Sequence, residues 1–576
     1  MKNKIIILLF AIGGIFASCS DAYDIQQKGD VFQGDEAFRE AKDIRRGLNV
    51  IYSSIPASTE VALGSIFTDE VSIGLNNGGQ GLISGEFGFM MESNNSYAAS
   101  LWNSYYTMIN RINRLEVITK NLLENAAAGS QEMGDLNDNL ADLYILRAFA
   151  HYKLFAYFTP DYTNGSGVSA IILDHVPPYD YTYSLPRNTV NEVKKFIEDD
   201  LERASTIRSS GWEATPNYVN SGTIAAIRVK LYAMTGQSDK VIEYGQEIMN
   251  RYSLAKAERY EILFARVANQ IDVNNGLDLI YEDNAVANEG TNVFVETIFR
   301  LKTTTSSGPS VIANWYSARA RYDGSYFYEM GRSLYNELDK LDPTKLGGEF
   351  TPRSGVLEPR EDVRYNVNLV PRLGREGVGR GTEVLTSYET ATQSEYESQD
   401  RLLIGKYRGT TGAELKNDVH IFRVADILLA MAEARAAQGQ ITSASTEPDD
   451  LIGNYSSVYS IIYNIRAHRT RSVKENFSDS DYSKVTMPTF SDQRSAYEAI
   501  LNERRVELAF EGHRYLDMKR LGVKAGSQGF TRYSKDCVVN GACNLPVNSH
   551  KMTLPIPVGE MTGNNSLTSD SQNPGY

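Results

Sequence analysis

The sequence has few of the residues, and none of the motifs, by which common enzyme classes are recognised. It contains no His-Glu-x-x-His zinc motif, no Gly-x-Ser-x-Gly nucleophile elbow and no phosphate loop ending in Gly-Lys-Ser/Thr. Its 6 histidines are scattered without metal-ligand spacing, so we expect neither a metal site nor a cofactor. The 58 basic residues are outnumbered by 72 acidic ones, and the net charge of −14 argues against binding to nucleic acid and against electrostatic attachment to anionic lipid.

Long apolar runs are also missing, with one exception at the N-terminus. Lys2 and Lys4 precede a short apolar stretch at 5–16, and small residues then lead to Cys19. The stretch is shorter than the roughly 20 residues that span a bilayer, and it resembles a bacterial lipoprotein signal. We expect cleavage after residue 18 and attachment of diacylglycerol to Cys19, which would hold the protein on a membrane surface. The alternative is an ordinary secretory signal in which Cys19 is incidental.

The chain has only 3 cysteines, and lipidation of the first leaves Cys537 and Cys543. They flank a segment containing Asn540 and Gly541 that predicts a hairpin tip. In a two-residue Asn-Gly turn the cysteines would point to opposite faces, whereas a three-residue loop with Gly541 as the bulge would place them opposite one another. Only the second geometry permits a disulfide. We therefore expect a surface disulfide; two free thiols or a metal-binding pair are the alternatives.

Apolar residues at helical spacing predict a mainly α-helical protein. Thr189 begins one helix with a capping-box-like Glu192 three residues later. Two amphipathic helices joined by a glycine turn at 236 predict a tetratricopeptide-type hairpin. The expected helices lie at 139–158, 189–207, 221–235, 239–252, 422–438 and 456–467.

The middle of the chain has a different composition. Residues 253–416 are rich in glycine, threonine, serine and aromatic residues with weak periodicity, which predicts loops and short strands laid over a helical scaffold. We therefore divide the chain into a signal peptide at 1–18, a helical region at 19–252 and a loop-rich, then helical region at 253–576.

Four separated segments resemble the SusD/RagB family of outer-membrane nutrient-uptake lipoproteins. They are RVADILLAMAEA at 423–434, ILNERRVELAFEGHRYLDMKR at 500–520, the ending LPIP at 554–557 with QNPGY at 572–576, and an early segment with Trp102 and Tyr105. Together with the lipoprotein signal they match the family in order and spacing over nearly the whole chain. The resemblance implies a mainly α, SusD-like fold, in which a tetratricopeptide-like helix-pair scaffold carries a long loop-rich, partly stranded region.

The resemblance also implies a function. Family members sit over the mouth of a TonB-dependent barrel of the SusC type, capture a glycan or peptide outside the cell, and close like a lid to deliver it. It implies that this chain is not an enzyme, that its partners are a SusC-like transporter and a glycan, and that its lipid anchors it to the outer membrane, facing outward. A peptide ligand is the alternative within the family.

Ligand-binding residues are expected in two stretches where aromatic and amide side chains gather, the first of them among glycines. The chain has 35 Tyr and 21 Phe but only 3 Trp, and rings in these stretches would form a shallow arc for successive sugar units. Trp102 follows helical spacing and is expected in the core, whereas binding and packing remain equally open for Trp315. The candidates are Asn76, Asn77, Gln80, Phe87 and Phe89 in the first stretch, and Trp315, Tyr316, Arg321 and Tyr322 in the second.

Glu503, Glu507 and Glu511 lie four residues apart and predict a row of carboxylates on one helix face. A lipid-anchored hydrolase of the retaining type would hold two carboxyl groups about 5 Å apart across a cleft. Because active carboxylates straddle a cleft instead of lining one helix face, we interpret the row as a structural ion-pair network and expect no catalytic residue. The expected partners are Arg504, Arg505 and Arg514.

Overall fold

The computed structural model of the protein is mainly helical, as the sequence predicts. Among the residues it describes, no helix is both long enough and apolar enough to cross a membrane. These residues are 37–74, 77, 85–180, 182–208, 216–264, 294–303, 311–316, 327–341, 360–369, 402–407, 409–410, 413–414, 417–474, 477, 480–537 and 541–576.

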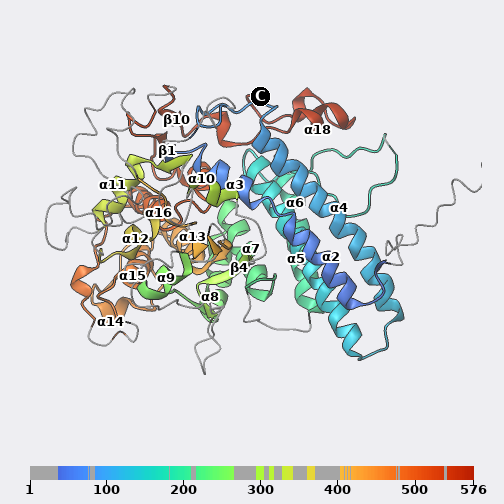
Figure 1. Ribbon diagram of the computed structural model, residues 1–576, viewed down its shortest axis with the longest axis horizontal. Helices are drawn as coiled ribbons and strands as arrows, with labels where there is room; N and C mark the ends of the chain where they lie inside the picture. The colour runs from blue at the N-terminus through green and yellow to red at the C-terminus, as the bar shows by residue number, and fades with distance from the viewer. Residues whose placement is uncertain are drawn as a thin grey trace, which may run out of the picture.

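The helices of the N-terminal region pack side by side, with α5 lying against α2, α4 and α6, and with α7 against α8 (Figure 1). The predicted hairpin is confirmed as α7 and α8. These helices are α2 (Ala41–Ser53), α3 (Ala57–Ser65), α4 (Ser96–Asn125), α5 (Gln131–Phe158), α6 (Val190–Ile207), α7 (Ser221–Met234) and α8 (Ser238–Met249).

Local hydrogen bonds account for where these helices begin. Thr189 and Glu192 form the predicted capping box, in which the Thr189 hydroxyl accepts from the Glu192 N–H at 3.3 Å. Gly236 joins α7 to α8 with φ at 74°, a left-handed conformation that glycine adopts without strain. Helix α5 begins eight residues before the predicted start at 139, because the Ser130 hydroxyl caps it by accepting a backbone N–H at 3.2 Å. Most of the residues between are polar, with Met133 and the buried Leu136 as apolar exceptions.

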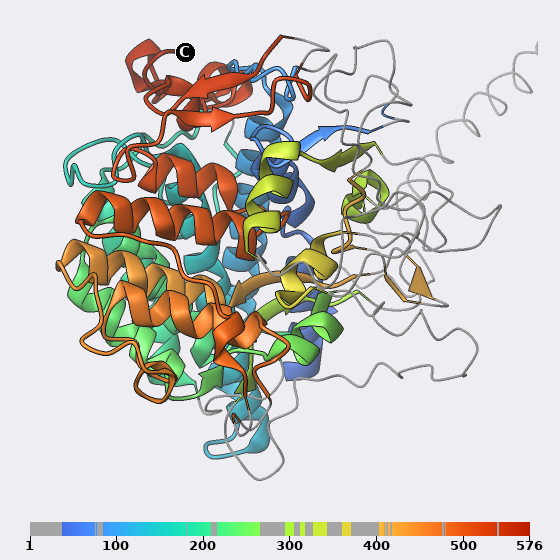
Figure 2. The ribbon, with the colours of Figure 1, turned by 90° about the vertical axis from the view of Figure 1, so that its left-hand side faces the viewer.

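The C-terminal helices stack on one another, and α13 contacts both α15 and α16 while α16 contacts α17 (Figure 2). The bounds of the α-helices are α9 (Ala257–Phe264), α10 (Val311–Tyr316), α11 (Arg332–Lys340), α12 (Val363–Asn368), α13 (Val424–Ala437), α14 (Pro448–Leu451), α15 (Val458–Arg469), α16 (Gln493–Glu507), α17 (Arg514–Leu521) and α18 (Val558–Gly563). Short 3-10 helices are η5 (Tyr482–Lys484), η6 (His550–Met552) and η7 (Ser569–Ser571).

The described strands form two-stranded ribbons, which fits the prediction of short strands over a helical scaffold. Parallel pairing joins β2 (Tyr252–Ser253) to β3 (Phe294–Val295). Antiparallel pairs are β1 (Val71–Ile73) with β5 (Tyr328–Met330), β4 (Thr297–Leu301) with β8 (Val419–Arg423), β6 (Gly409–Thr410) with β7 (Ala413–Glu414), and β9 (Gly529–Thr531) with β10 (Asn544–Pro546).

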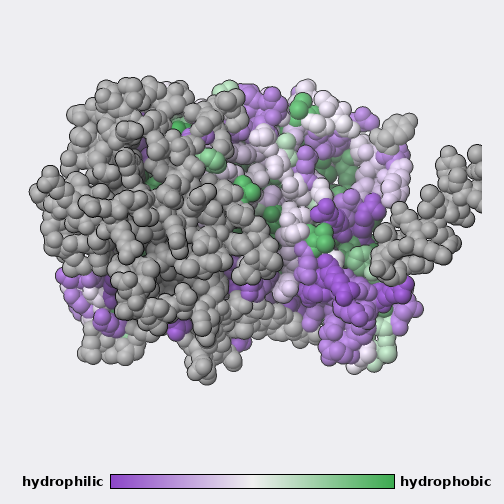
Figure 3. Space-filling model, viewed as in Figure 1, coloured by the Kyte–Doolittle hydropathy of each residue, from purple (hydrophilic) through white to green (hydrophobic). Residues whose placement is uncertain are grey.

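Helix α13 ties the two halves of the chain together. It is buried around most of its circumference and packs against α7 and α8 from the N-terminal region as well as α15 and α16. One core cluster therefore contains residues from Ala41 to Leu567, on both sides of the predicted boundary at 252/253. Over α2 and α4 the described outer surface is mostly hydrophilic (Figure 3). Exposed apolar side chains on these helices include Val50 and Val117.

Candidate binding site

The structure brings the two predicted binding stretches together at the ribbon of β1 and β5. Antiparallel pairing places Ile73 opposite Tyr328. Beyond the strand ends, the Phe327 carbonyl accepts hydrogen bonds from the Gly74 N–H and from Asn77 Nδ2, both at 2.9 Å. Asn77 and Phe327 are 250 residues apart in sequence, so this contact could not be read from either stretch alone.

Trp315 lies near the end of α10, next to this ribbon. The Phe327 N–H donates to the Trp315 carbonyl at 3.1 Å, and α10 packs against α3 and β5. The Trp315 side chain is partly buried against the apolar cluster beneath the ribbon. Tyr316, by contrast, is only 1% exposed and its hydroxyl is hydrogen-bonded to Ser65. The prediction that both rings contact a ligand is therefore corrected, because the core holds Tyr316 and leaves only Trp315 of this pair partly exposed.

Phe87 and Phe89 also belong to the core, which corrects their assignment as ligand-contacting rings. Their side chains are 0% and 3% exposed. The Arg532 guanidinium lies 3.9 Å from the Phe87 ring centre and 4.0 Å from that of Phe89, and Phe89 stacks on Phe530 at 6.3 Å. These two rings fasten the segment before α4 to the β9–β10 ribbon. Arg532 lies far away in the sequence, so no local pattern predicted its contact with the two rings.

Two buried oxygen atoms beside the ribbon lack a hydrogen-bond donor. The Glu86 side chain is 3% exposed, and its Oε1 accepts from the Ser96 hydroxyl at 3.1 Å. Its Oε2, like Oδ1 of the equally buried Asn77, has no partner in the part of the chain that the structure describes. Buried polar atoms are almost always paired, so these two acceptors mark a place where donors belong.

Two tyrosines, Tyr97 and Tyr328, lie near these acceptors. Burial, and then the Glu86 carboxylate, raise the pKa of Tyr97 well above its ordinary value. Burial, opposed by a hydrogen bond from Asn77 and reinforced by Glu86, raises the pKa of Tyr328 to about 12. Both phenols therefore keep their protons at neutral pH. We call the whole group the ribbon site; its members are Asn77, Glu86, Tyr97, Trp315, Phe327 and Tyr328.

Several predicted positions cannot be compared with the structure. Cys19 and the ligand candidates Asn76, Gln80, Arg321 and Tyr322 lie outside the described residues.

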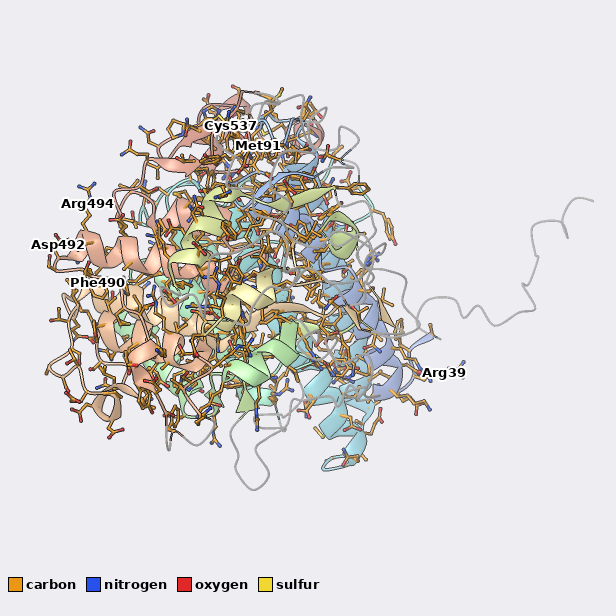
Figure 4. All side chains as sticks on the ribbon, turned by 60° about the vertical axis from the view of Figure 1, so that its left-hand side comes forward. Arg39, Met91, Phe490, Asp492, Arg494 and Cys537 are labelled. Atoms are coloured by element: carbon orange, nitrogen blue, oxygen red, sulfur yellow. A yellow bond between two sulfur atoms is a disulfide. The ribbon has the colours of Figure 1, made fainter. Side chains whose placement is uncertain are left out.

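The predicted disulfide between Cys537 and Cys543 is confirmed, with the two Cα atoms 5.2 Å apart. Gly541 has a positive φ of 69°. The predicted three-residue hairpin loop was wrong, because β9 and β10 pair Thr531 with Asn544 and the Arg532 N–H donates to the Cys543 carbonyl, which leaves Cys537 beyond the strand. Both cysteines lie in the connection between β9 and β10, at the same end of the molecule as Met91 (Figure 4). The bridge closes a loop next to Arg532, which donates to the Ala542 carbonyl at 3.1 Å.

The glutamate row is a buried ion-pair network, as the sequence analysis interpreted it. Glu507 Oε1 lies 2.7 Å from Arg423 Nη1 and 2.8 Å from Arg469 Nη2, and its Oε2 lies 3.3 Å from Arg364 Nη1. Although burial alone would raise it, these three guanidinium groups hold the pKa of Glu507 well below its ordinary value. A general acid would need the opposite shift. Glu503 pairs with Arg364 and Arg466, and Glu511 with Lys406 and Arg423.

The expected partners of this row were wrong. Arg504 pairs with Asp426 and Asp517 at 2.6 and 2.7 Å, and Arg505 and Arg514 both pair with Asp69. Neighbours one residue along a helix point to different faces. In addition α16 ends at Glu507, so residues beyond it leave the helical register.

A separate polar cavity lies between α3, α5, α7 and α17. Its volume is about 30 Å³, enough for roughly two water molecules and too small for a sugar ring. Paired charges such as Lys230 with Asp426 line it. A ligand of appreciable size therefore has to bind elsewhere.

Comparisons with known proteins agree with this architecture. A model of the SusD family matches residues 302–576, and a model described as starch-binding and associating with the outer membrane matches residues 53–231. SusD-like protein P2 of Formosa agariphila is 22% identical over 100% of this chain and 99% of its own.

Solved structures share the fold. A SusD homolog from Bacteroides thetaiotaomicron aligns with a TM-score of 0.63 at 14% identity, over 94% of this chain and 98% of its own. A laminarin-binding SusD-like protein aligns with a TM-score of 0.57 at 16% identity, over 94% of this chain and 100% of its own. The architecture is that of a mainly helical protein that carries short two-stranded ribbons. Within that class, the chain belongs to the SusD/RagB family.

Proposed function

We propose that the protein is a non-catalytic glycan-binding lipoprotein of the outer cell surface. It captures a glycan at the ribbon site and delivers it to a SusC-like, TonB-dependent transporter in the outer membrane. Cys19 carries the lipid that anchors it. The starch-binding description of one matching family model and the laminarin-binding structural relative support a glycan as the ligand class.

One observation carries this proposal. The partly exposed Trp315 lies next to the ribbon at which two buried acceptors, Glu86 Oε2 and Asn77 Oδ1, have no hydrogen-bond donor among the described residues. An indole ring offers an apolar face to the C–H groups of a sugar, and amide and carboxylate oxygens accept from its hydroxyls. Binding sites commonly combine apolar rings with a few polar atoms that fix orientation. The glutamates that a hydrolase reading would need are held instead by arginines, which supports binding without turnover.

A glycan and oligopeptide array separates the two ligand classes within the family. The soluble body from residue 20 onward, without the lipid, is expected to bind at least one glycan and no oligopeptide. A reducing-end assay on the bound glycan is expected to detect no product. Binding of oligopeptides alone would contradict the ligand class, and product release by the purified protein would contradict the absence of catalysis.

The cellular part of the proposal has its own test. Full-length protein carrying a C-terminal tag is expected to take up a labelled fatty acid, to be digested by protease added to intact cells, and to co-purify with a SusC-like transporter. Cys19→Ala should remove the label and release the protein from the membrane. Label uptake by the Cys19→Ala variant, or protection from protease in wild type, would contradict the anchor or its orientation. The disulfide between Cys537 and Cys543 supports an oxidising compartment outside the cytosol.

A further inference from the structure

The ribbon site contains two unpaired oxygen acceptors, and no positively charged side chain of the described residues neutralises the Glu86 carboxylate. Glu86 Oε2 and Asn77 Oδ1 are buried and unpartnered, and among the described residues no lysine or arginine forms an ion pair with Glu86. Ser96 supplies the carboxylate with a single hydroxyl donor. Leaving a buried acceptor unpaired costs about 1–3 kcal/mol, and more when it is charged. A bound molecule that brings donors would recover this free energy.

Arg532, the neighbouring basic side chain, does not donate to these two oxygen atoms. Arg532 lies over Phe87 and Phe89, and its guanidinium donates to the backbone carbonyls of Thr68, Ile66, Phe87 and Ala542. Burial lowers the pKa of Arg532 to about 9, so it remains protonated at neutral pH and engaged with the backbone. The unpaired polar atoms of the ribbon site are therefore oxygen acceptors, one of them a carboxylate oxygen.

From this geometry we infer that the ribbon site selects neutral, hydroxyl-bearing glycans and that Glu86 excludes sulfated and uronic-acid glycans. The inference rests on the proposed function, because it assigns a ligand class to the same site. Sugar hydroxyls are donors of the kind that Glu86 Oε2 and Asn77 Oδ1 lack, and the partly buried Tyr97, Trp315 and Phe327 offer ring surfaces at the same ribbon. A sulfate or carboxylate would set acceptor against acceptor and like charge against like charge, which costs several kcal/mol at an interface. The net charge of −14 acts in the same direction.

Matched polymers test this selectivity. Laminarin, dextran and pullulan, each paired with its chemically sulfated form, are titrated into the soluble body by calorimetry. At least one neutral member is expected to bind, with its sulfated form weaker by about tenfold or more, which corresponds to about 1.4 kcal/mol. Glu86→Gln keeps the size of the side chain and removes its charge. It should therefore reduce, severalfold, the ratio of the affinity for the neutral polymer to the affinity for its sulfated form. Glu92→Gln is the control, because Glu92 is exposed and carries the same change six residues away.

A second variant guards against a structural artefact. Glu86→Asp keeps the negative charge but shortens the side chain by one methylene group. It should therefore weaken binding of the neutral glycan while still excluding the sulfated form. Equal or tighter binding of a sulfated polymer by wild type, or an unchanged ratio in Glu86→Gln, would overturn the inference and leave glycan capture standing. If the array and the titrations detect no glycan at all, the proposed function fails and the selectivity fails with it.

Discussion

Arg423 in β8 and Glu507 in α16 lie 2.7 Å apart although 84 residues separate them in sequence. Both side chains are at most 1% exposed. Arg423 also binds Glu511 and Glu296, and Glu507 also binds Arg364 and Arg469. This contact therefore lies at the centre of a charge network that joins the strand region to the C-terminal helices.

Removing the charge of Glu507 should strongly destabilise the fold. Glu507→Gln leaves three buried arginines facing a neutral amide, and breaking a buried ion pair by changing one partner costs about 3–5 kcal/mol. Chemical denaturation measures the free energy of unfolding. Glu498→Gln is the matched control, since Glu498 is exposed on the same helix and should change stability by less than about 0.5 kcal/mol. Equal effects of the two variants would show that the network contributes no special stability.

Stability should fall as the pH is lowered from 7 to 5. Burial lowers the pKa of His151, His420 and His468 to about 3 and that of His513 to about 4. The unfolded chain takes up these protons near its ordinary pKa of about 6.5 while the folded chain does not, so each histidine removes up to about 1.36 kcal/mol per pH unit. Glu70 opposes this, because burial raises its pKa to about 8 and the folded state holds that proton.

The net slope of unfolding free energy against pH should therefore remain positive, since four histidines outweigh one glutamate. Denaturation curves at half-unit intervals measure it. A free energy of unfolding that stays constant or increases as the pH is lowered from 7 to 5 would contradict the burial of these histidines.

Opening the disulfide should weaken the loop that carries it. Cys537 and Cys543 are 6 residues apart in sequence, and closing so short a loop restricts the unfolded chain by about 2 kcal/mol on the chain-entropy estimate. Cys537→Ala/Cys543→Ala should lower the free energy of unfolding by that amount, and reductant should then have no further effect. Two free thiols in the untreated, exported protein by thiol titration would contradict the bridge.

A close backbone approach between α3 and the turn after α16 should not tolerate a methyl group. A Cβ added at Gly64 would lie 2.5 Å from the Cα of Gly512, which itself has φ at 86°. Gly64→Ala should therefore destabilise by about 1–3 kcal/mol, as overpacked cores do. Gly134→Ala, in α5 with nothing within 4 Å of its added Cβ, should be neutral or stabilising by up to about 1 kcal/mol. Similar melting temperatures for the two variants would contradict the contact.

The sequence predicted α5 to α8, α13 and α15 because the signals of these helices are local. The Thr189 capping box and the Gly236 turn depend on residues within one helical turn, and α7 and α8 follow their predicted bounds within a few residues. The disulfide was likewise predicted from two cysteines around a glycine. Helix α5 begins earlier than predicted, since its first turns are mostly polar and are fixed by the Ser130 cap.

The binding site was harder to predict, because its geometry depends on long-range contacts. Asn77 and Trp315 remain predicted ligand contacts, and the structure adds that the ribbon of β1 and β5 places their stretches side by side. It could not distinguish Phe87 from Trp315, since both are aromatic residues in irregular segments. Phe87 is buried because it packs into an apolar cluster and lies beneath the distant Arg532. Glu86 gave no signal beyond its charge.

The most direct test of glycan capture at the ribbon site is the affinity of Trp315→Ala for the neutral glycan that wild type binds. Calorimetry should show a loss of about fivefold or more, because truncating an anchoring ring typically costs more than about 1 kcal/mol. Tyr179→Ala is the control, since this ring is 98% exposed in another loop, and it should bind like wild type. Unchanged affinity in a folded Trp315→Ala protein would contradict the account.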